Sequence, residues 1–282
     1  MRTLNFDSKK PLLYLVPTPI GNMQEVSPRM IEVLSSMNLI ACEDTRVTGK
    51  LLNMLGLKKE LVSLREHNEV SQSQDLVKRI LSGEKVAYMS DAGYPCISDP
   101  GAKFVQICLE NGINVTCISG PNAALNALAA SGLPSDHFYF HGFLQAKESA
   151  KLEELRELLN KKETLIFYEA PHRIQKTLES MYEILGDRKA CIARELTKKH
   201  EEFIRGSLKE LSKIDPETLI GEMVIIVEGF NGEEKPIIGN NDLVGMVKSL
   251  VESGMSTKDA IKKVSEITNI SKNQIYKIYH LN

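Results

Sequence analysis

Tryptophan is absent from this chain of 282 residues, and long apolar runs are absent as well. Without tryptophan, aromatic stacking on a nucleotide base would depend on tyrosine or phenylalanine. The first apolar run, Leu12 to Val16, is far shorter than a signal-peptide core or the ~20 residues that a membrane helix needs. We therefore expect a cytoplasmic protein with no membrane partner.

Cysteine and net charge are also low. The five cysteines are odd in number and never spaced as CxxC, which argues against a disulfide framework or a zinc site and predicts no bound metal. The 35 basic and 37 acidic residues leave a net charge of −2. This balance excludes a uniformly basic nucleic-acid binder but leaves room for a local basic face. Neither GxGxxG nor GxxxxGK[ST] occurs, which disfavours a standard dinucleotide fold and a P-loop.

Strand-like and helix-like segments alternate through the first half of the chain. Ser27 and Pro28 mark the start of one helix, and Gly83 and Gly112 mark the ends of two others. Such alternation is typical of parallel βαβ units. The segments are strands near 12–16, 39–41, 85–90 and 115–119, and helices near 28–37, 71–82 and 101–111.

The second half predicts a mixed sheet, because strands follow one another near Phe203. Its predicted strands are 138–143, 164–169, 189–194 and 222–228, and its predicted helices are 147–162 and 172–185. We expect an α/β protein with two α/β domains and a small C-terminal tail. The predicted boundaries are 1–122, 123–230, and 231–282 for the linker and tail.

The tail has the outline of a helix-turn-helix. Ser256 and Asp259 resemble a capping box, and Ser271 is placed to cap a second helix after a break at 268–270. Residues 244–282 hold six lysines against three acidic residues, a local charge of +3. Two interpretations stay open: the helices contact nucleic acid, or they dock on a neighbouring part of the protein or a dimer mate.

Four polar loops rich in glycine and proline each follow a predicted strand, where open α/β sheets bind their ligands. They read PTPIGN (17–22), CEDTR (42–46), SDAGYPCISDPG (90–101) and GPNA (120–123). Together with SGLP (131–134), YEAPHR (168–173), ARELTKKHE (193–201) and GEMVIIVEG (221–229), these motifs resemble the tetrapyrrole methylase superfamily, and within it the branch that acts on ribosomal RNA. Tyr94 and Asn122 depart from that branch, which usually has Thr and Ser there.

The resemblance implies two α/β domains with S-adenosyl-L-methionine (SAM) in the cleft between them, and a homodimer. It also implies methyl transfer to the 2′-hydroxyl of a cytidine in the decoding region of 16S rRNA in the small ribosomal subunit. Asp91 is interpreted as shaping its loop or facing the sulfonium. The other residues implied to line the SAM pocket are Ile20, Tyr94, Ile97, Asn122, Ala123, Tyr168 and Met223.

A ribose hydroxyl is weakly acidic, so a positioned base would accelerate the transfer by roughly 10²–10⁴-fold. The candidate catalytic carboxylates at strand ends are Asp99, Glu169 and Glu195. Asp99 has a second interpretation, as the cap of the helix after Pro100.

The candidate contacts to RNA are basic residues near these loops. Pro171 predicts a helix start there, where free N–H groups suit a phosphate. Arg194 and Glu195 have an alternative interpretation as an ion pair, and the lysines as a solvated face. The candidates are Arg46, His172, Arg173, Arg194, Lys198 and Lys199.

Two other functions compete with rRNA methylation. One is methylation of a small tetrapyrrole-like substrate, which would not need the basic clusters. The other, from a different class, is a nucleic-acid-binding regulator built on the C-terminal helix-turn-helix. The regulator hypothesis predicts that residues 244–282 alone bind DNA tightly. This hypothesis is weak, because the segment carries only three net positive charges.

Overall fold

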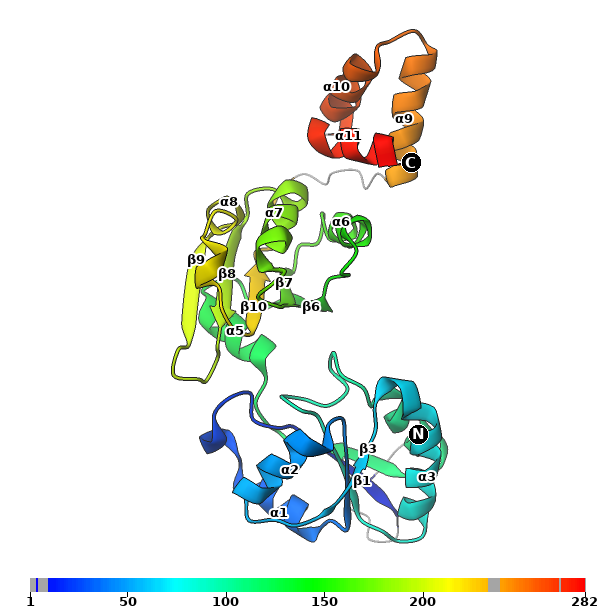
Figure 1. Ribbon diagram of the computed structural model, residues 1–282, viewed down its shortest axis with the longest axis vertical. Coiled ribbons are helices and arrows are strands. Elements are labelled where there is room, and N and C mark those ends of the chain that lie inside the picture. The colour runs from blue at the N-terminus through cyan, green and yellow to red at the C-terminus, as the bar shows by residue number, and fades with distance from the viewer. Residues whose placement is uncertain (1–3, 5–9, 233–238, 269, 282) are drawn as a thin grey trace. The chain divides into compact units, whose positions relative to one another are not determined.

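A computed structural model describes residue 4 and residues 10–232, 239–268 and 270–281. The chain divides into two compact units, shown in Figure 1. Unit 1 comprises Met1–Ala123 and the short segment Leu196–Lys199, and unit 2 comprises Ala124–Glu195 and His200–Asn282. The first crossing between the units follows directly after the Gly120-Pro121-Asn122 cluster.

Unit 1 contains a five-stranded sheet in the order β3-β2-β4-β1-β5, and every pair in it is parallel. The parallel βαβ prediction is therefore confirmed. The strands are β1 (Leu12–Val16), β2 (Leu39–Cys42), β3 (Glu60–Ser63), β4 (Val86–Met89) and β5 (Asn114–Cys117).

Helices cover both faces of this sheet. α1 (Pro28–Ser36) and α2 (Thr45–Met54) pack on the face that carries Val16 and Ile40. α3 (Glu69–Leu81) and α4 (Ala102–Glu110) pack on the opposite face. The neighbouring strands β1 and β4 therefore send their following helices, α1 and α4, to opposite faces. Such a switch point opens a crevice at the carboxyl ends of the strands, where α/β proteins bind ligands.

The starts of α1 and α4 are stabilised in different ways. Ser27 accepts a hydrogen bond from the Met30 amide, and Pro28 fills the first position of α1, as predicted. Asp99 does not cap α4. The Glu69 carboxylate, from α3, accepts hydrogen bonds from the amides of Gly101, Lys103 and Phe104 at 3.0, 2.9 and 3.2 Å. The capping interpretation of Asp99 is therefore wrong.

Unit 2 contains a mixed sheet in the order β6-β7-β10-β8-β9. β6 and β7 are parallel, and the other three pairs are antiparallel, which confirms the mixed sheet. The strands are β6 (Phe138–Phe143), β7 (Thr164–Glu169), β8 (Lys189–Arg194), β9 (Glu202–Ser207) and β10 (Met223–Val227).

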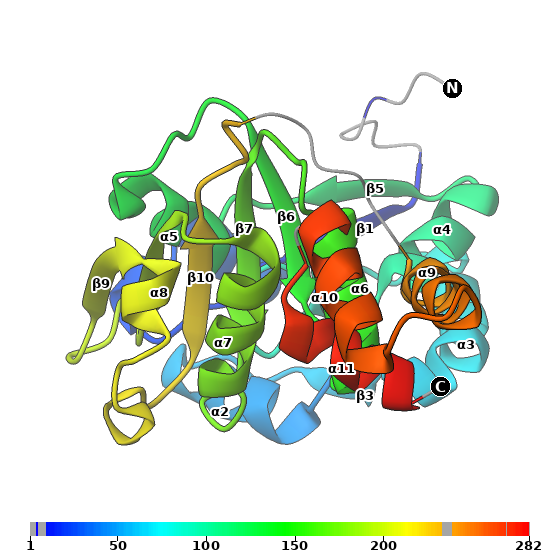
Figure 2. The ribbon, with the colours of Figure 1, turned by 90° about the horizontal axis from the view of Figure 1, so that it is seen from above.

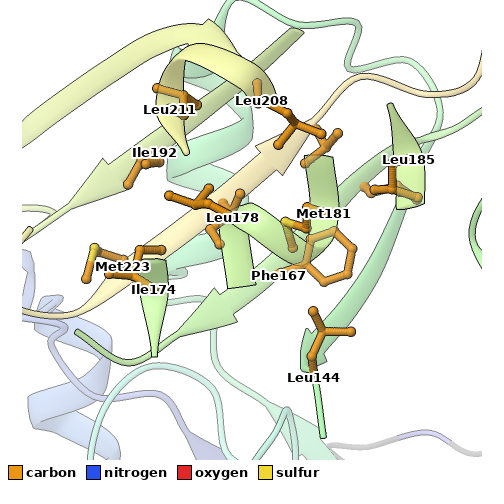
Figure 3. Close-up of a cluster of buried hydrophobic side chains, with 14 of the residues drawn as sticks. Leu144, Phe167, Ile174, Leu178, Met181, Leu185, Ile192, Leu208, Leu211 and Met223 are labelled. Carbon is orange, nitrogen blue, oxygen red and sulfur yellow. The ribbon is translucent and has the colours of Figure 1, made fainter. Parts of the chain in front are cut away.

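Helices α6 (Glu148–Glu157), α7 (Ile174–Leu185) and α8 (Leu208–Leu211) contribute to the core on one face of this sheet (Figures 2 and 3). α6 ends five residues before the predicted end, and α7 begins two residues later than predicted. His172 and Arg173 therefore precede the helix instead of forming its first turn. The remaining elements of the two units are α5 (Ala123–Ser131) and the 3-10 turns η1 (Met23–Glu25), η2 (Glu66–Asn68) and η3 (Pro216–Thr218).

Three helices lie between residues 240 and 281 (Figure 1), and they share a hydrophobic core of their own. They are α9 (Asn240–Glu252), α10 (Thr257–Thr268) and α11 (Lys272–Leu281). The Ser256 hydroxyl accepts from the Asp259 amide at 3.1 Å, as the capping pattern predicts. The sequence prediction missed α9. Among the described residues, no helix has the length and apolar character needed to cross a membrane.

Candidate functional site

The loops after β1 and β4 are joined by backbone hydrogen bonds. Thr18 and Gly93 exchange two of them, at 2.9 and 3.0 Å. The Thr18 hydroxyl donates to the Ser90 carbonyl at 3.2 Å, and the Ser90 hydroxyl donates to the Gly93 carbonyl at 2.7 Å. All three residues are buried, so these bonds fix the two loops at the switch point.

The loop after β5 joins the same group. The Gly120 amide donates to the Tyr94 hydroxyl at 3.0 Å. A Cβ atom on Gly120 would lie 2.7 Å from the Pro17 Cβ, so the β1 and β5 loops approach more closely than a side chain allows. Ile20 lies against Gly93, and Asn122 and Ala123 follow at the start of α5. Unit 1 thus brings together Ile20, Tyr94, Asn122 and Ala123, which had been predicted to lie near one ligand.

Asp91 connects the β4 loop to the β2 loop, because its carboxylate accepts from the Asp44 amide at 3.2 Å. Burial is the main cause that raises the pKa of Asp91. Asp44 caps α2 and forms an ion pair of 2.5 Å with Arg46, which lowers the pKa of Asp44 far below its usual range. The Arg46 side chain is 82% exposed, so it remains accessible to an anionic partner.

Asp99 lies farther along the β4 loop and is partly buried. Burial raises its pKa, and the nearby carboxylates of Glu43 and Asp91 add to the effect, so the pKa reaches about 6. Among the described residues, its carboxylate has no hydrogen-bond partner. Cys96 and Ser98, just before it, have left-handed backbones with φ of 70° and 62°. Such strain in residues other than glycine is common at functional sites. Ile97, between them, is 45% exposed.

Several predicted site residues lie at the same end of the three central strands of the unit 2 sheet. Met223 of β10 lies opposite Glu169 of β7 and Arg194 of β8. Tyr168 and Met223, however, face opposite sides of the sheet. The Met223 side chain belongs to the hydrophobic core beside Ile174 (Figure 3), so it offers a ligand only its backbone.

The Glu169 carboxylate is buried and engaged at both oxygens. Oε1 accepts from the Ala170 amide at 2.9 Å and lies 3.2 Å from Arg173 Nε, while Oε2 accepts from the Thr177 hydroxyl at 2.5 Å. The Arg173 guanidinium also donates to the Leu144 carbonyl at 2.6 Å. These contacts make Glu169 and Arg173 a buried brace between β7, α7 and the end of β6. His172, beside them, is exposed.

Arg194 pairs with Glu202 at 2.5 Å, and it also donates to the Ile220 carbonyl at 3.2 Å. Arg194 of β8 thus forms an ion pair with Glu202 of β9. Glu195 has a left-handed backbone with φ of 51°, and its carboxylate packs against Gly221 and accepts from the Glu222 amide at 3.2 Å.

Lys198 and Lys199 belong to the short segment that joins unit 1. The aliphatic stem of Lys198 crosses Gly21 so closely that a Cβ there would lie 2.5 Å from Lys198 Cγ. Lys198 thus lies beside the PTPIGN loop, and Lys199 is exposed. The lysines at 198 and 199 do not by themselves indicate in the sequence that this segment packs with unit 1.

Sequence comparisons show the family to which the chain belongs. The sequence model described as Tetrapyrrole (Corrin/Porphyrin) Methylases matches residues 12–212. The chain belongs to this family. It is 42% identical to Ribosomal RNA small subunit methyltransferase I of Bacillus subtilis, with 99% of this chain and 98% of the relative covered. It is 45% identical to the protein of the same name from Halalkalibacterium halodurans, with 96% and 95% covered.

Solved structures share the tetrapyrrole methylase fold. The methyltransferase CobJ matches with a TM-score of 0.59 and 20% identity, covering 80% of this chain and 97% of that one. A uroporphyrin-III-C-methyltransferase from Thermus thermophilus matches with a TM-score of 0.55 and 19% identity, covering 78% and 94%. The family resemblance and the α/β fold predicted from the sequence are both confirmed.

The loops of this family member suit the methyl donor SAM. Ile20 and Ile97 are accessible apolar side chains of the β1 and β4 loops, and Asp91 is a partly buried carboxylate of the β4 loop. The close approach of Gly120 to Pro17 leaves no room for a side chain at residue 120. Among the described residues, no group of three or more His, Cys, Asp or Glu is arranged to hold a metal ion.

Proposed function

We propose that the chain is a SAM-dependent methyltransferase that methylates the ribose 2′-hydroxyl of a cytidine in the decoding region of 16S rRNA. The observation that carries the substrate class is the similarity of 42–45% over at least 95% of both chains to relatives named for rRNA methylation. The two solved methyltransferases, one of them a uroporphyrin-III-C-methyltransferase, are only 19–20% identical and support the fold alone.

The unit 1 residues that would contact the cofactor are Ile20, Asp91, Tyr94, Ile97, Asn122 and Ala123. Tyr168 and the Met223 backbone are further predicted contacts, and they rest on the family resemblance. When bound, SAM supplies a methyl group on a positively charged sulfur. Tyr94 serves this arrangement indirectly, because its hydroxyl holds the β4 and β5 loops in register.

Asp99 is the base that the geometry favours. Its pKa of about 6 leaves the carboxylate ionised at neutral pH and still basic enough to accept a proton from the 2′-hydroxyl. Both Glu169 oxygens are engaged in the buried brace, so that residue is better suited to positioning YEAPHR. Glu195 is held against Gly221, which favours a role in shaping the β8 end.

Contacts to the RNA backbone would come from accessible cations. His172, Lys199 and Arg46 are exposed, and Lys198 lies beside the PTPIGN loop. Arg173 and Arg194 are engaged within the protein and would act by holding their loops. We also propose that the protein works in the cytoplasm as a homodimer, in keeping with a ribosomal substrate and with the family resemblance.

The test offers the chain two acceptors with radiolabelled SAM. One is the small ribosomal subunit from cells that lack the modification, and the other is a uroporphyrinogen. We expect label in 16S rRNA and none in the macrocycle. Transfer to the macrocycle alone would support the alternative function of a tetrapyrrole methylase.

A further inference from the structure

The exposed face of α11 has the composition of a nucleic-acid contact. Lys272, Asn273, Tyr276, Lys277 and His280 are exposed and follow a helical spacing of four residues, which puts them on one side of the helix. The opposite side, with Ile275 and Ile278, is buried in the core of the three C-terminal helices. No acidic residue occurs between Lys272 and Leu281.

Two of these side chains form an aromatic pair on that face. The rings of Tyr276 and His280 lie 4.2 Å apart, and Tyr276 is 56% exposed. Aromatic rings beside lysines suit a ribose-phosphate chain, because the rings contact sugars or bases while the ammonium groups pair with phosphates. Residues 244–282 carry +3 in a chain of net charge −2, so residues 1–243 carry −5. The positive charge is thus concentrated in the C-terminal helices.

The comparisons separate this region from the methyltransferase body. The rRNA relatives match 96–99% of this chain. The two solved methyltransferases align over 94–97% of their own length yet cover only 78–80% of this chain, and the family sequence model ends at residue 212. The solved methyltransferases therefore leave about a fifth of this chain unmatched, whereas the relatives named for an RNA substrate match nearly all of it.

We propose that the exposed face of α11 is a docking surface for the rRNA substrate, in which Lys272 and Lys277 contact phosphates and Tyr276 contacts sugar or base. This inference rests on the proposed rRNA methylation and adds a second contact area to it. The C-terminal helices hold the RNA by its backbone, and the loops of the methyltransferase fold select the nucleotide. The surface supplies affinity and leaves the chemical step unchanged.

The test compares two full-length double variants that lose the same charge. K272A/K277A removes the lysines from the α11 face, and K248A/K258A removes two exposed lysines from α9 and α10. Each is titrated with unmodified small ribosomal subunits at several salt concentrations, and SAM affinity and thermal unfolding are measured alongside. We expect K272A/K277A to weaken binding about tenfold. The slope of log affinity against log salt concentration should fall in magnitude by about 1.4–1.8, because each of the two lost phosphate contacts removes ~0.7–0.9 from it.

For K248A/K258A we expect less than a twofold change, and for both variants we expect wild-type kcat at saturating substrate and wild-type SAM affinity. An equal loss of affinity in both variants would mean that the effect comes from the net charge of the chain and not from the α11 face, and it would overturn the proposal. Wild-type binding by K272A/K277A would do the same. A shift of that variant from dimer to monomer in sedimentation would assign α11 to a contact between copies instead.

Duplex DNA of matched length serves as the competitor. If the duplex DNA displaces the small subunit from the chain as well as an rRNA fragment of the same length does, the surface is not specific for the RNA substrate and the proposal fails. A wild-type chain that binds small subunits but transfers no methyl to them contradicts the proposed function while leaving the α11 surface intact.

Discussion

The Asp99 carboxylate combines partial burial, neighbouring negative charge and a lack of hydrogen-bond partners among the described residues. The first two properties each disfavour the ionised form, and together they raise the pKa of Asp99 to about 6. A carboxylate tuned in this way is a better proton acceptor than an ordinary one and is still ionised at neutral pH.

Asp99→Asn should lower kcat at pH 7.5 by roughly 10²–10⁴-fold, the usual contribution of a general base. In the wild-type chain, log kcat should rise with pH and level off above about pH 6, following the pKa of Asp99. The measurement is a pH–rate profile with small subunits as acceptor. An Asp99→Asn variant that keeps the wild-type rate and profile would remove Asp99 from the chemistry.

The same substitution should increase stability. Because the pKa of Asp99 is raised from 3.8 to about 6 on folding, the folded chain binds more protons than the unfolded chain between those values. The free energy of unfolding therefore falls as the pH rises through this window, and the penalty is complete at pH 7. Urea unfolding at pH 7 should give a higher midpoint for Asp99→Asn, which separates loss of the base from loss of the fold.

Arg173 shows where residue-type reasoning was insufficient. A basic residue after Pro171 suggested a phosphate contact, but the structure engages it with Glu169 and the Leu144 carbonyl. The Glu169 side chain is 1% exposed, and Arg173 is its cationic partner within the protein. Nothing in YEAPHR alone indicates that its Glu and Arg face each other across the turn.

Arg173→Ala should destabilise the chain by on the order of 3 kcal/mol, because it leaves the buried Glu169 carboxylate without its cation. The adjacent His172→Ala is the control, since His172 is exposed and its loss should leave the urea midpoint unchanged. Equal midpoints for the two variants would mean that the brace contributes nothing to the fold.

At the scale of elements, a side chain of α3 anchors the end of the β4 loop by hydrogen bonds. The Glu69 carboxylate accepts hydrogen bonds from three amides at the start of α4. The free N–H groups of the helix that follows Asp99 are therefore already paired with a carboxylate. This contact spans more than thirty residues of sequence, which is why the local pattern at Asp99 and Pro100 predicted the wrong cap.

Glu69→Gln should cost about 1 kcal/mol of unfolding free energy, in the range of a lost helix cap, and should weaken SAM binding because the β4 loop loses its anchor. Glu66→Gln, an exposed position just before α3, should change neither quantity. The measurements are urea unfolding and SAM titration calorimetry. Identical behaviour of the two variants would contradict the role given to Glu69.

Elements with continuous apolar runs and recognisable caps were predictable, and others were not. β6, β7 and β8 occur at the predicted residues, because β7 and β8 read as buried apolar runs and β6 as an aromatic run. β3 was missed because it is a partly exposed edge strand of four residues. The loop predicted over 42–46 hides the start of α2, although an Asp before Thr45 is a usable N-cap signal.

At the scale of the whole molecule, the sequence predicted two α/β parts and a helical tail but not how the chain passes between them. The segment Leu196–Lys199 returns to unit 1 after the second sheet has begun. Lys198 thereby reaches the PTPIGN loop, more than 170 residues away in sequence. The site residues of unit 1 were predictable from motifs at strand ends, whereas the engaged states of Glu169, Arg173 and Arg194 required the fold.

Deleting residues 236–282 should leave the fold and SAM binding of the remaining chain unchanged, because α9, α10 and α11 have a core of their own. The truncated chain should unfold cooperatively in a thermal scan and bind SAM with wild-type affinity, while its affinity for small subunits falls. Aggregation of the truncated chain would instead make the tail part of the structural core.

The most direct test of the central claim maps the methyl group on the RNA. Unmodified small subunits are incubated with the chain and labelled SAM, and the 16S rRNA is then hydrolysed with alkali, which spares the bond next to a 2′-O-methylated ribose. The account predicts one labelled, alkali-resistant cytidine dinucleotide from the decoding region. Label on a base, on another nucleotide or on no RNA at all would contradict it.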